Sequence, residues 1–161
     1  MSTQENLVAV CQMTSRNNKS ENLKTCTNLI EKASLKGAKM VFLPEACDYI
    51  GESRTETLQL AEPLNGPLVN QYQTLAKEFN VWISLGGIHE RVSDEKVRNA
   101  HVIINSGGEI VAVYHKTHLF DIDMPDKSVR LRESDYVEPG KQIVPPVPSP
   151  VGNVGLCVVS F

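Results

Sequence analysis

The sequence predicts an α/β fold built as a single domain. Short apolar runs of strand length alternate with segments whose apolar residues recur at helical spacing. The first runs are apolar on both faces, which is typical of parallel strands covered on two sides. A chain of 161 residues with 41% apolar side chains is enough for one hydrophobic core. In sheets of this class, ligands bind at the carboxyl ends of the strands.

The first predicted unit is a strand, a helix and a second strand. Residues 7–11 and 40–43 are the two strand-like runs. Between them Ser20 precedes a helix with an apolar stripe at positions i, i+3, i+7 and i+10, formed by Leu23, Cys26, Ile30 and Ala33. Pro44 ends the second strand because it cannot donate to a sheet ladder. Glu45 is therefore expected just beyond the carboxyl end of that strand.

The middle of the chain predicts a second helix and a third strand. Residues 49–66 are polar and then rich in turn residues, which predicts a loop with a single helical turn. Pro67 suits the first position of a helix, and the apolar spacing extends that helix to Phe79. Residues 81–87 then form an apolar run that predicts a strand.

A predicted hairpin follows. Residues 100–105 and 110–114 are its two arms, and Gly107 and Gly108 supply the backbone freedom that a tight connection needs. Lys116 lies just beyond the second arm.

The last third of the chain predicts little regular structure. Residues 117–138 are charged and irregular, and a loop of that length in a compact domain is usually functional or disordered. The proline-rich residues 144–150 predict a stiff, extended connector. The apolar run 154–161 predicts a final strand. We expect this strand to form an open apolar edge, which is an aggregation hazard.

Composition excludes several classes of function. The formal net charge of -3, without a basic stripe, argues against a nucleic-acid surface or a polybasic membrane anchor. The four cysteines form no C-x-x-C pair, which predicts free thiols in a reducing compartment. The sequence has neither a signal-peptide pattern nor an apolar run of membrane-spanning length. We therefore expect a cytoplasmic protein with a small-molecule partner, or a mitochondrial one if a transit segment precedes it.

The order of short sequence blocks resembles the nitrilase, or carbon-nitrogen hydrolase, superfamily. The blocks are V-F-L-P-E (41–45), G-G-I-H-E-R (86–91), Y-H-K-T-H-L-F (114–120), E-S-D-Y-V-E-P-G (133–140) and V-G-L (154–156). Within that superfamily the chain looks like the amidase branch that acts on deaminated glutathione. The resemblance implies an α-β-β-α sandwich, no cofactor, and assembly into dimers or larger oligomers. It also implies that residues 1–161 are a partial, C-terminally truncated domain, the N-terminal portion of the sandwich without its second half.

The resemblance assigns roles to three residues. Amide hydrolysis through a thioester needs a thiolate, a base that creates it, and a cation or N–H groups that hold the oxyanion. Glu45 matches the general base, Lys116 the oxyanion stabiliser, and Glu133 the second carboxylate near that lysine. Each has a plainer reading, because Glu45 alone could be a solvated loop residue or helix cap, and Lys116 a surface charge. Glu133 could instead pair with Arg130 or Arg132.

The sequence contains no strong metal signal. His115 and His118 lack a third ligand at a suitable spacing, so we interpret them as packing or hydrogen-bonding residues and predict no metal site.

The chain departs from the superfamily at its nucleophile. The position that matches the cysteine is Val159, and the only nearby thiol, Cys157, lies two residues earlier. In a strand Cys157 would face the same side as Val159 but lie about 6.6 Å away, beyond the reach that proton transfer requires. Cys47 lies on a different element.

Two functions remain open from the sequence. The first is an amidase of the nitrilase superfamily, related to hydrolysis of deaminated glutathione, in which this chain is inactive or severely impaired. The second is a non-catalytic truncated isoform that binds ligand or subunits of its full-length parent, or has no stable function. Rescue of catalysis by Cys157 is a third and weaker hypothesis.

Overall fold

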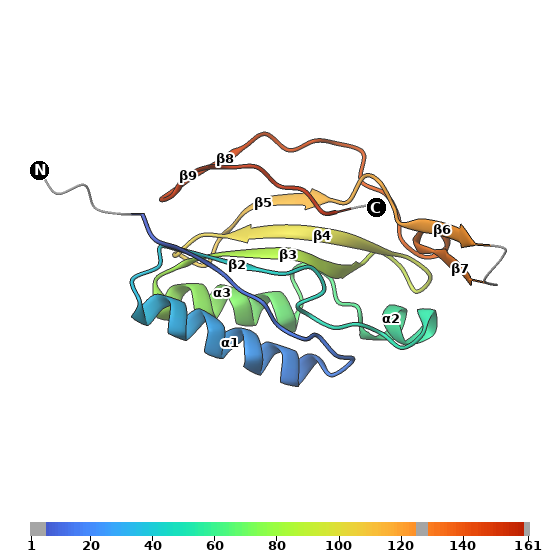
Figure 1. Ribbon diagram of the computed structural model, residues 1–161, viewed down its shortest axis with the longest axis horizontal. Coiled ribbons are helices and arrows are strands. Elements are labelled where there is room, and N and C mark those ends of the chain that lie inside the picture. Colours follow the sequence, from blue (N-terminus) through green and yellow to red (C-terminus); the bar gives the residue numbers. More distant parts are fainter. Residues whose placement is uncertain (1–5, 125–128, 160–161) are drawn as a thin grey trace, which may run out of the picture.

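The structure is a computed structural model that describes residues 6–124 and 129–159. A five-stranded sheet forms the centre, in the order β1-β2-β3-β4-β5, and two helices cover one of its faces (Figure 1). The first three strands are parallel, and β3, β4 and β5 are antiparallel; they are β1 (Val8–Val10), β2 (Met40–Leu43), β3 (Trp82–Arg91), β4 (Val97–Ile104) and β5 (Ile110–His115).

The two long helices lie where the sequence predicts them. Helix α1 (Lys19–Leu35) is capped by Asn18, whose side chain accepts a hydrogen bond from the backbone N–H of Glu21 (3.1 Å). Helix α3 (Pro67–Phe79) starts with proline and ends at Asn80 in the left-handed conformation. Both faces that pack on the sheet are apolar, so local sequence signals are sufficient to place these helices.

A short helix, α2 (Arg54–Leu60), corrects the prediction that residues 49–66 form a loop with a single helical turn. Ser53 caps it by accepting a hydrogen bond from the Glu56 N–H (3.2 Å), and Thr57 is its buried residue. The sequence did not reveal this helix because the helix lies on the surface. It buries one residue and has no apolar stripe.

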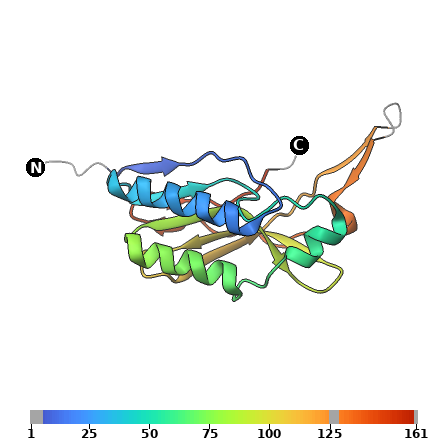
Figure 2. The same ribbon diagram turned by 90° about the horizontal axis from the view of Figure 1, so that it is seen from below.

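Residues 117–138 contain a two-stranded ribbon that the sequence reading missed. Strands β6 (Asp121–Met124) and β7 (Val129–Arg132) pair in antiparallel register outside the main sheet, and a 3-10 turn, Glu133–Asp135, follows. The ribbon projects from the body of the molecule at the same end as α2 (Figure 2). Apolar and polar residues do alternate along both strands, but each run is only four residues long, too short to be told from an irregular charged segment by sequence pattern.

The main core lies between the sheet and the helices. It contains buried side chains from α1, α3 and the helix-facing side of every inner strand, among them Ile30, Tyr72, Ile83 and Leu85. No helix in the described ranges is long and apolar enough to cross a bilayer.

The opposite face of the sheet is covered by the C-terminal part of the chain. A second, smaller hairpin of β8 (Val147–Ser149) and β9 (Gly152–Val154) lies over it (Figure 1). Leu156 packs there against Met40, Ile103 and Tyr114. The proline-rich connector is therefore extended, as predicted, and it also contributes one arm of a hairpin.

The predicted final strand is wrong between residues 155 and 159, which form no strand pairing. Leu156 is buried and Val158 half-buried, so this run folds onto the sheet and does not present an apolar edge. The exposed apolar edge is instead at β1, where Val10 is 82% exposed. The sequence could not distinguish these two positions because both runs are short and apolar.

Candidate active site

Glu45 lies where a bulge in β3 lets two backbones approach closely. Ala46 donates its N–H to the carbonyl of Gly87 (2.7 Å), which ties the turn after β2 to β3. A Cβ at Gly86 would lie 2.5 Å from the carbonyl oxygen of Leu43, so only glycine fits there. A Cβ at Gly87 would lie 3.1 Å from the Cγ of Glu45. The glycine pair thus positions the carboxylate at the carboxyl end of β2, as the sequence predicts.

Lys116 is buried beside that carboxylate. Lys116 is only 4% exposed, and its Nζ lies 3.7 Å from Glu45 Oε1 and 3.0 Å from Glu133 Oε2. Its backbone is held on both sides, because its N–H donates to Asn99 (2.9 Å) and its carbonyl accepts from Gly140 (2.8 Å). A buried ammonium is costly without partners, so the two carboxylates compensate for its desolvation.

Glu133 completes a cluster of three charged side chains. Its Oε2 accepts a hydrogen bond from the backbone N–H of Phe120 (2.6 Å) and contacts Lys116. Within the described residues no ion pair joins it to Arg130 or Arg132. Of the two pairings that the sequence left open, the structure therefore has the one with Lys116.

Asn99 is a site residue that sequence reasoning missed. Its Nδ2 donates to Glu45 Oε1 at 2.6 Å, while its Oδ1 is buried without a hydrogen-bond partner. The contact orients the carboxylate toward Lys116. The sequence contains no clear signal for it, because β4 also contains Arg98 and His101, and a polar residue in a strand does not reveal which distant residue it meets.

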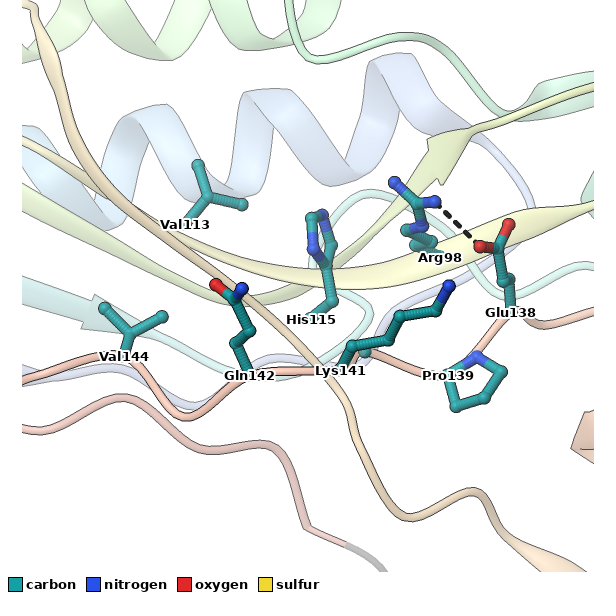
Figure 3. Close-up of a pocket in the computed structure, with 9 residues that line it drawn as sticks. Arg98, Val113, His115, Glu138, Pro139, Lys141, Gln142 and Val144 are labelled. Atoms are coloured by element: carbon teal, nitrogen blue, oxygen red, sulfur yellow. Dashed lines mark hydrogen bonds and ion pairs between the residues drawn. The ribbon is translucent and has the colours of Figure 1, made fainter.

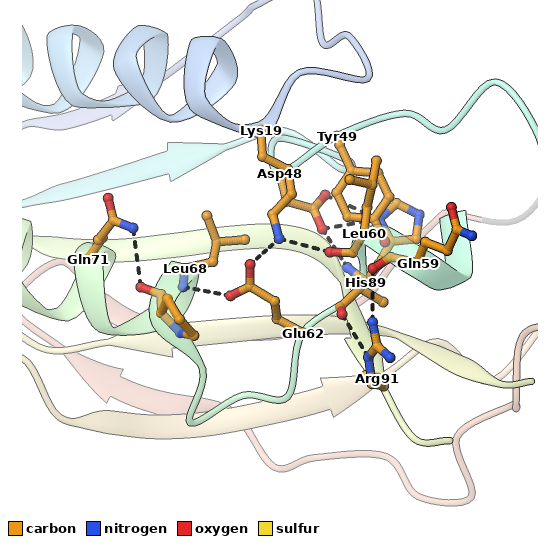
Figure 4. Close-up of polar contacts among 12 residues, drawn as sticks. Lys19, Asp48, Tyr49, Gln59, Leu60, Glu62, Leu68, Gln71, His89 and Arg91 are labelled. Carbon is orange, nitrogen blue, oxygen red and sulfur yellow. Dashed lines mark hydrogen bonds and ion pairs between the residues drawn. The ribbon is translucent and has the colours of Figure 1, made fainter. Parts of the chain in front are cut away.

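A second polar network holds the loop that follows Glu45 (Figure 4). Asp48 is 1% exposed and accepts hydrogen bonds from the backbone N–H of His89 (2.7 Å) and from its Nδ1 (3.1 Å). The imidazole stacks on Tyr49 with ring centroids 4.4 Å apart. Burial opposes protonation of His89, but the carboxylates of Asp48, Glu45 and Glu133 together outweigh it and raise the pKa of the imidazole. The network therefore ties this loop to β3, next to the cluster of Glu45, Lys116 and Glu133.

An open cavity of about 560 Å³ lies above this cluster. Seven of its eleven lining residues are charged. The lining comes from the turn after β2, from α2, from the end of β5, and from the β6–β7 ribbon and the turn that follows it. The lining residues are Glu45, Arg54, Lys116, Phe120, Arg130, Leu131, Arg132, Glu133, Asp135, Tyr136 and Val159. The structure thus brings the three predicted site residues and Val159 to one cavity.

The cysteines do not complete this site in the described part of the chain. Cys157 is exposed, lies outside the cavity lining, and its carbonyl accepts a hydrogen bond from His101 Nδ1 (2.9 Å). Cys47 is fully buried in the main core, where the adjacent Cys26 thiol and burial both raise its pKa. Neither thiol is placed near Lys116 by these contacts.

His115, the last residue of β5, and His118, which follows the strand, both make hydrogen bonds, in agreement with their sequence interpretation. His115 Nε2 lies 2.7 Å from Glu90 Oε2, and His118 Nδ1 lies 3.0 Å from Thr117 Oγ1. No group of three possible metal ligands occurs among residues 6–124 and 129–159. His115 also borders a separate cavity of about 220 Å³, where Arg98 pairs with Glu138 at 2.8 Å (Figure 3).

Over nearly its whole length the chain is similar to curated proteins that are named as amidases. Deaminated glutathione amidase from Mus musculus is 51% identical over 156 residues, which cover 94% of this chain and 48% of that protein. The Homo sapiens protein of the same name is 47% identical, with 94% and 47% covered. The chain therefore spans about half the length of these curated relatives.

Solved structures agree with the fold. The Caenorhabditis elegans NitFhit protein has a TM-score of 0.85 and 41% identity, over 93% of this chain and 37% of that one. An amidase from Nesterenkonia sp. has a TM-score of 0.76 at 18% identity, over 93% and 54%, a likeness of fold alone. The carbon-nitrogen hydrolase family model matches residues 7–160. The predicted α/β fold and nitrilase resemblance are confirmed, and the chain belongs to the carbon-nitrogen hydrolase family.

Proposed function

We propose that this chain carries the base, the lysine and the second carboxylate of an amide-hydrolysing site, and binds an amide there without cleaving it. The observation that carries this proposal is the position of Lys116. It is buried between Glu45 and Glu133 and lines an open cavity. A buried cation at the wall of a cavity is suited to stabilise the negative charge that develops on an oxyanion.

The residues have distinct roles in the proposed chemistry. In a site that also contains the thiol, Glu45 takes the proton of that thiol. The thiolate attacks the amide carbonyl, and Lys116 Nζ donates a hydrogen bond to the carbonyl oxygen, which becomes negative. The C–N bond breaks, and Glu45 returns the proton to the leaving amine. Water, deprotonated by Glu45, then attacks the thioester, so that a carboxylate leaves and the thiol regains its proton. Glu133 and Asn99 hold Lys116 and Glu45 in position.

The missing participant is the thiol. Val159 stands where the superfamily resemblance expects the cysteine, and it lines the same cavity as Glu45 and Lys116. A valine side chain can neither form a thioester nor exchange a proton. We therefore expect no hydrolysis by this chain alone, and ligand binding in its place.

The substrate class follows from the relatives. The Mus musculus and Homo sapiens proteins named deaminated glutathione amidase are 51% and 47% identical to this chain over 94% of its length. We propose deaminated glutathione as the amide that the cavity accepts.

Val159→Cys tests the proposal by restoring a thiol at the matched position. We expect the variant to form a thioester with deaminated glutathione, detected by intact-protein mass spectrometry as an added acyl mass. The 161-residue chain without substitutions should show no such mass. Combining Val159→Cys with Glu45→Gln should slow acylation by about 100-fold, the usual scale of general-base catalysis.

Two controls make the result decisive. Val159→Ser places a hydroxyl of similar size at the same position and should not acylate measurably. Acylation of the unsubstituted chain that disappears on Cys157→Ala would instead establish Cys157 as the nucleophile. No acylation of Val159→Cys, in a folded protein that also fails to bind the amide, would refute the assignment of this site.

A further inference from the structure

We propose that Arg54, Arg130 and Arg132 form a carboxylate-recognising wall of the cavity and select anionic amides. This inference rests on the proposed function, because it takes Glu45 and Lys116 as the place where the amide lies. It adds the residues that distinguish an anionic substrate from a neutral one.

The three arginines reach one cavity from two separate elements. Arg54 is the first residue of α2, and Arg130 and Arg132 alternate along β7. Residues two apart on a strand project to the same side, so the two β7 guanidiniums act together. Helix α2 and the ribbon lie at the same end of the molecule in both views (Figures 1 and 2).

These arginines make no ion pair with a carboxylate elsewhere in the described chain. In contrast, Arg98 pairs with Glu138 at 2.8 Å and Arg91 with Asp94 at 3.7 Å. Across the ribbon, Asp121 lies opposite Arg132. Hydrogen bonds from the Ser134 hydroxyl (2.7 Å) and backbone N–H (3.0 Å) and, less strongly, the charge of Arg132 lower the pKa of Asp121, but no ion pair joins the two side chains. The guanidinium groups are therefore available to a ligand.

The charge of the cavity is opposite to that of the chain. Its two carboxylates nearest Lys116 are Glu45 and Glu133, and both contact that ammonium. The outer lining then has three guanidiniums and one carboxylate, Asp135, in a protein of net charge -3. A locally positive cavity in an acidic protein concentrates anions and repels cations.

The chemistry of this wall indicates its ligand. A guanidinium binds a carboxylate through two parallel hydrogen bonds, which gives orientation as well as affinity. Phe120, Leu131 and Tyr136 also line the cavity and offer apolar contact to a short aliphatic chain. An amide that carries carboxylates and no ammonium group fits this lining. Deaminated glutathione has that character, because removal of the amino group leaves two carboxylates without a compensating cation.

Calorimetric titration of the unsubstituted 161-residue chain tests the wall. Equilibrium affinity can be measured because the chain is not expected to hydrolyse its ligand. The probes are deaminated glutathione and the neutral diamide glutaramide. Arg130→Gln combined with Arg132→Gln should weaken deaminated glutathione by about 10-fold or more, the scale of lost charge-assisted hydrogen bonds. Glutaramide binding should not change. Arg98→Gln, in the separate cavity, is the matched control and should alter neither affinity.

The outcomes separate the two proposals. Unchanged affinity for deaminated glutathione in the double variant would overturn the arginine wall. If glutaramide binds the unsubstituted chain as tightly as deaminated glutathione, the cavity takes amides but does not select anions, and the wall is refuted while the proposed function stands. If neither probe binds, the proposed function fails and this inference fails with it. Unchanged thermal midpoints of the variants would exclude unfolding as the cause, as expected for exposed arginines.

Discussion

The two faces of the main sheet are covered in different ways. On one face the amphipathic helices α1 and α3 pack against the sheet and bury a continuous apolar core. On the other, the β8–β9 hairpin and the extended residues that follow it cover a smaller apolar cluster. That second face also holds a buried polar pair, Ser84 Oγ and His101 Nε2 at 2.7 Å. The comparison teaches that helical cover rests on local sequence patterns, whereas extended cover depends on a few long-range contacts.

The largest effect is expected on the helix-covered face. Ile83→Ala removes a fully buried side chain from the main core, which should lower the free energy of unfolding by about 3 to 4 kcal/mol. Urea denaturation followed by circular dichroism measures this change. Leu35→Ala, at a position that is 81% exposed on α1, is the control and should change stability by less than about 0.5 kcal/mol.

A smaller loss should follow truncation on the extended face. Leu156→Ala removes the principal buried contact of residues 155–159, and it should cost about 2 kcal/mol, near the lower end for such changes. Hydrogen exchange should also become faster at Val154 and Leu156 than in α1. A loss as large as that of Ile83→Ala would contradict the contrast between the two faces.

Removing the buried hydroxyl should have a still smaller effect. Ser84→Ala leaves His101 Nε2 without its 2.7 Å partner, which should cost about 1 to 2 kcal/mol. Denaturation midpoints of Ser84→Ala and of Ser84→Ala combined with His101→Leu would measure it. The double variant should regain part of the loss, because no polar group then remains unpaired. If Ser84→Ala alone is neutral, this pair contributes nothing to the extended face.

The smallest expected effect is a response to acid. Burial lowers the pKa of His101, and the carbonyl of Cys157 only partly opposes this. Because the unfolded state then binds protons more readily, stability should fall as pH decreases through the range below the ordinary histidine pKa. His101→Gln should reduce the difference between melting temperatures at pH 7.5 and pH 5.5. His89 has the opposite sign, since its pKa is raised, so His89→Gln should enlarge that difference.

Local signals were sufficient for part of the fold. The apolar spacing and Pro67 place α3, and the run 40–43 is β2. They failed for α2, because a surface helix with one buried residue has no apolar face to detect. They also ended β3 too early. After the bulge at Gly86 and Gly87 that strand continues through polar residues to Arg91, held by antiparallel pairing with β4.

The candidate site divides in the same way. Glu45, Lys116 and Glu133 were named from residues and resemblance, and the structure brings them within 3.0 to 3.7 Å contacts. Asn99 was not predicted, because its role depends on one hydrogen bond to a residue far away in the chain. The arginines of the cavity were likewise indistinguishable from solvated surface charges until β7 and α2 were placed beside it.

The sequence by itself determined the α/β class, the two long helices and the absence of cysteine at position 159. It could do so because helix caps, apolar spacing and residue identity are local properties. Only the tertiary structure decided that residues 155–159 fold over the sheet, and that Val159 and three arginines border the cavity of Lys116. These are contacts between distant segments, whose free energy depends on the packing of the whole sheet and is not encoded in any short stretch of sequence.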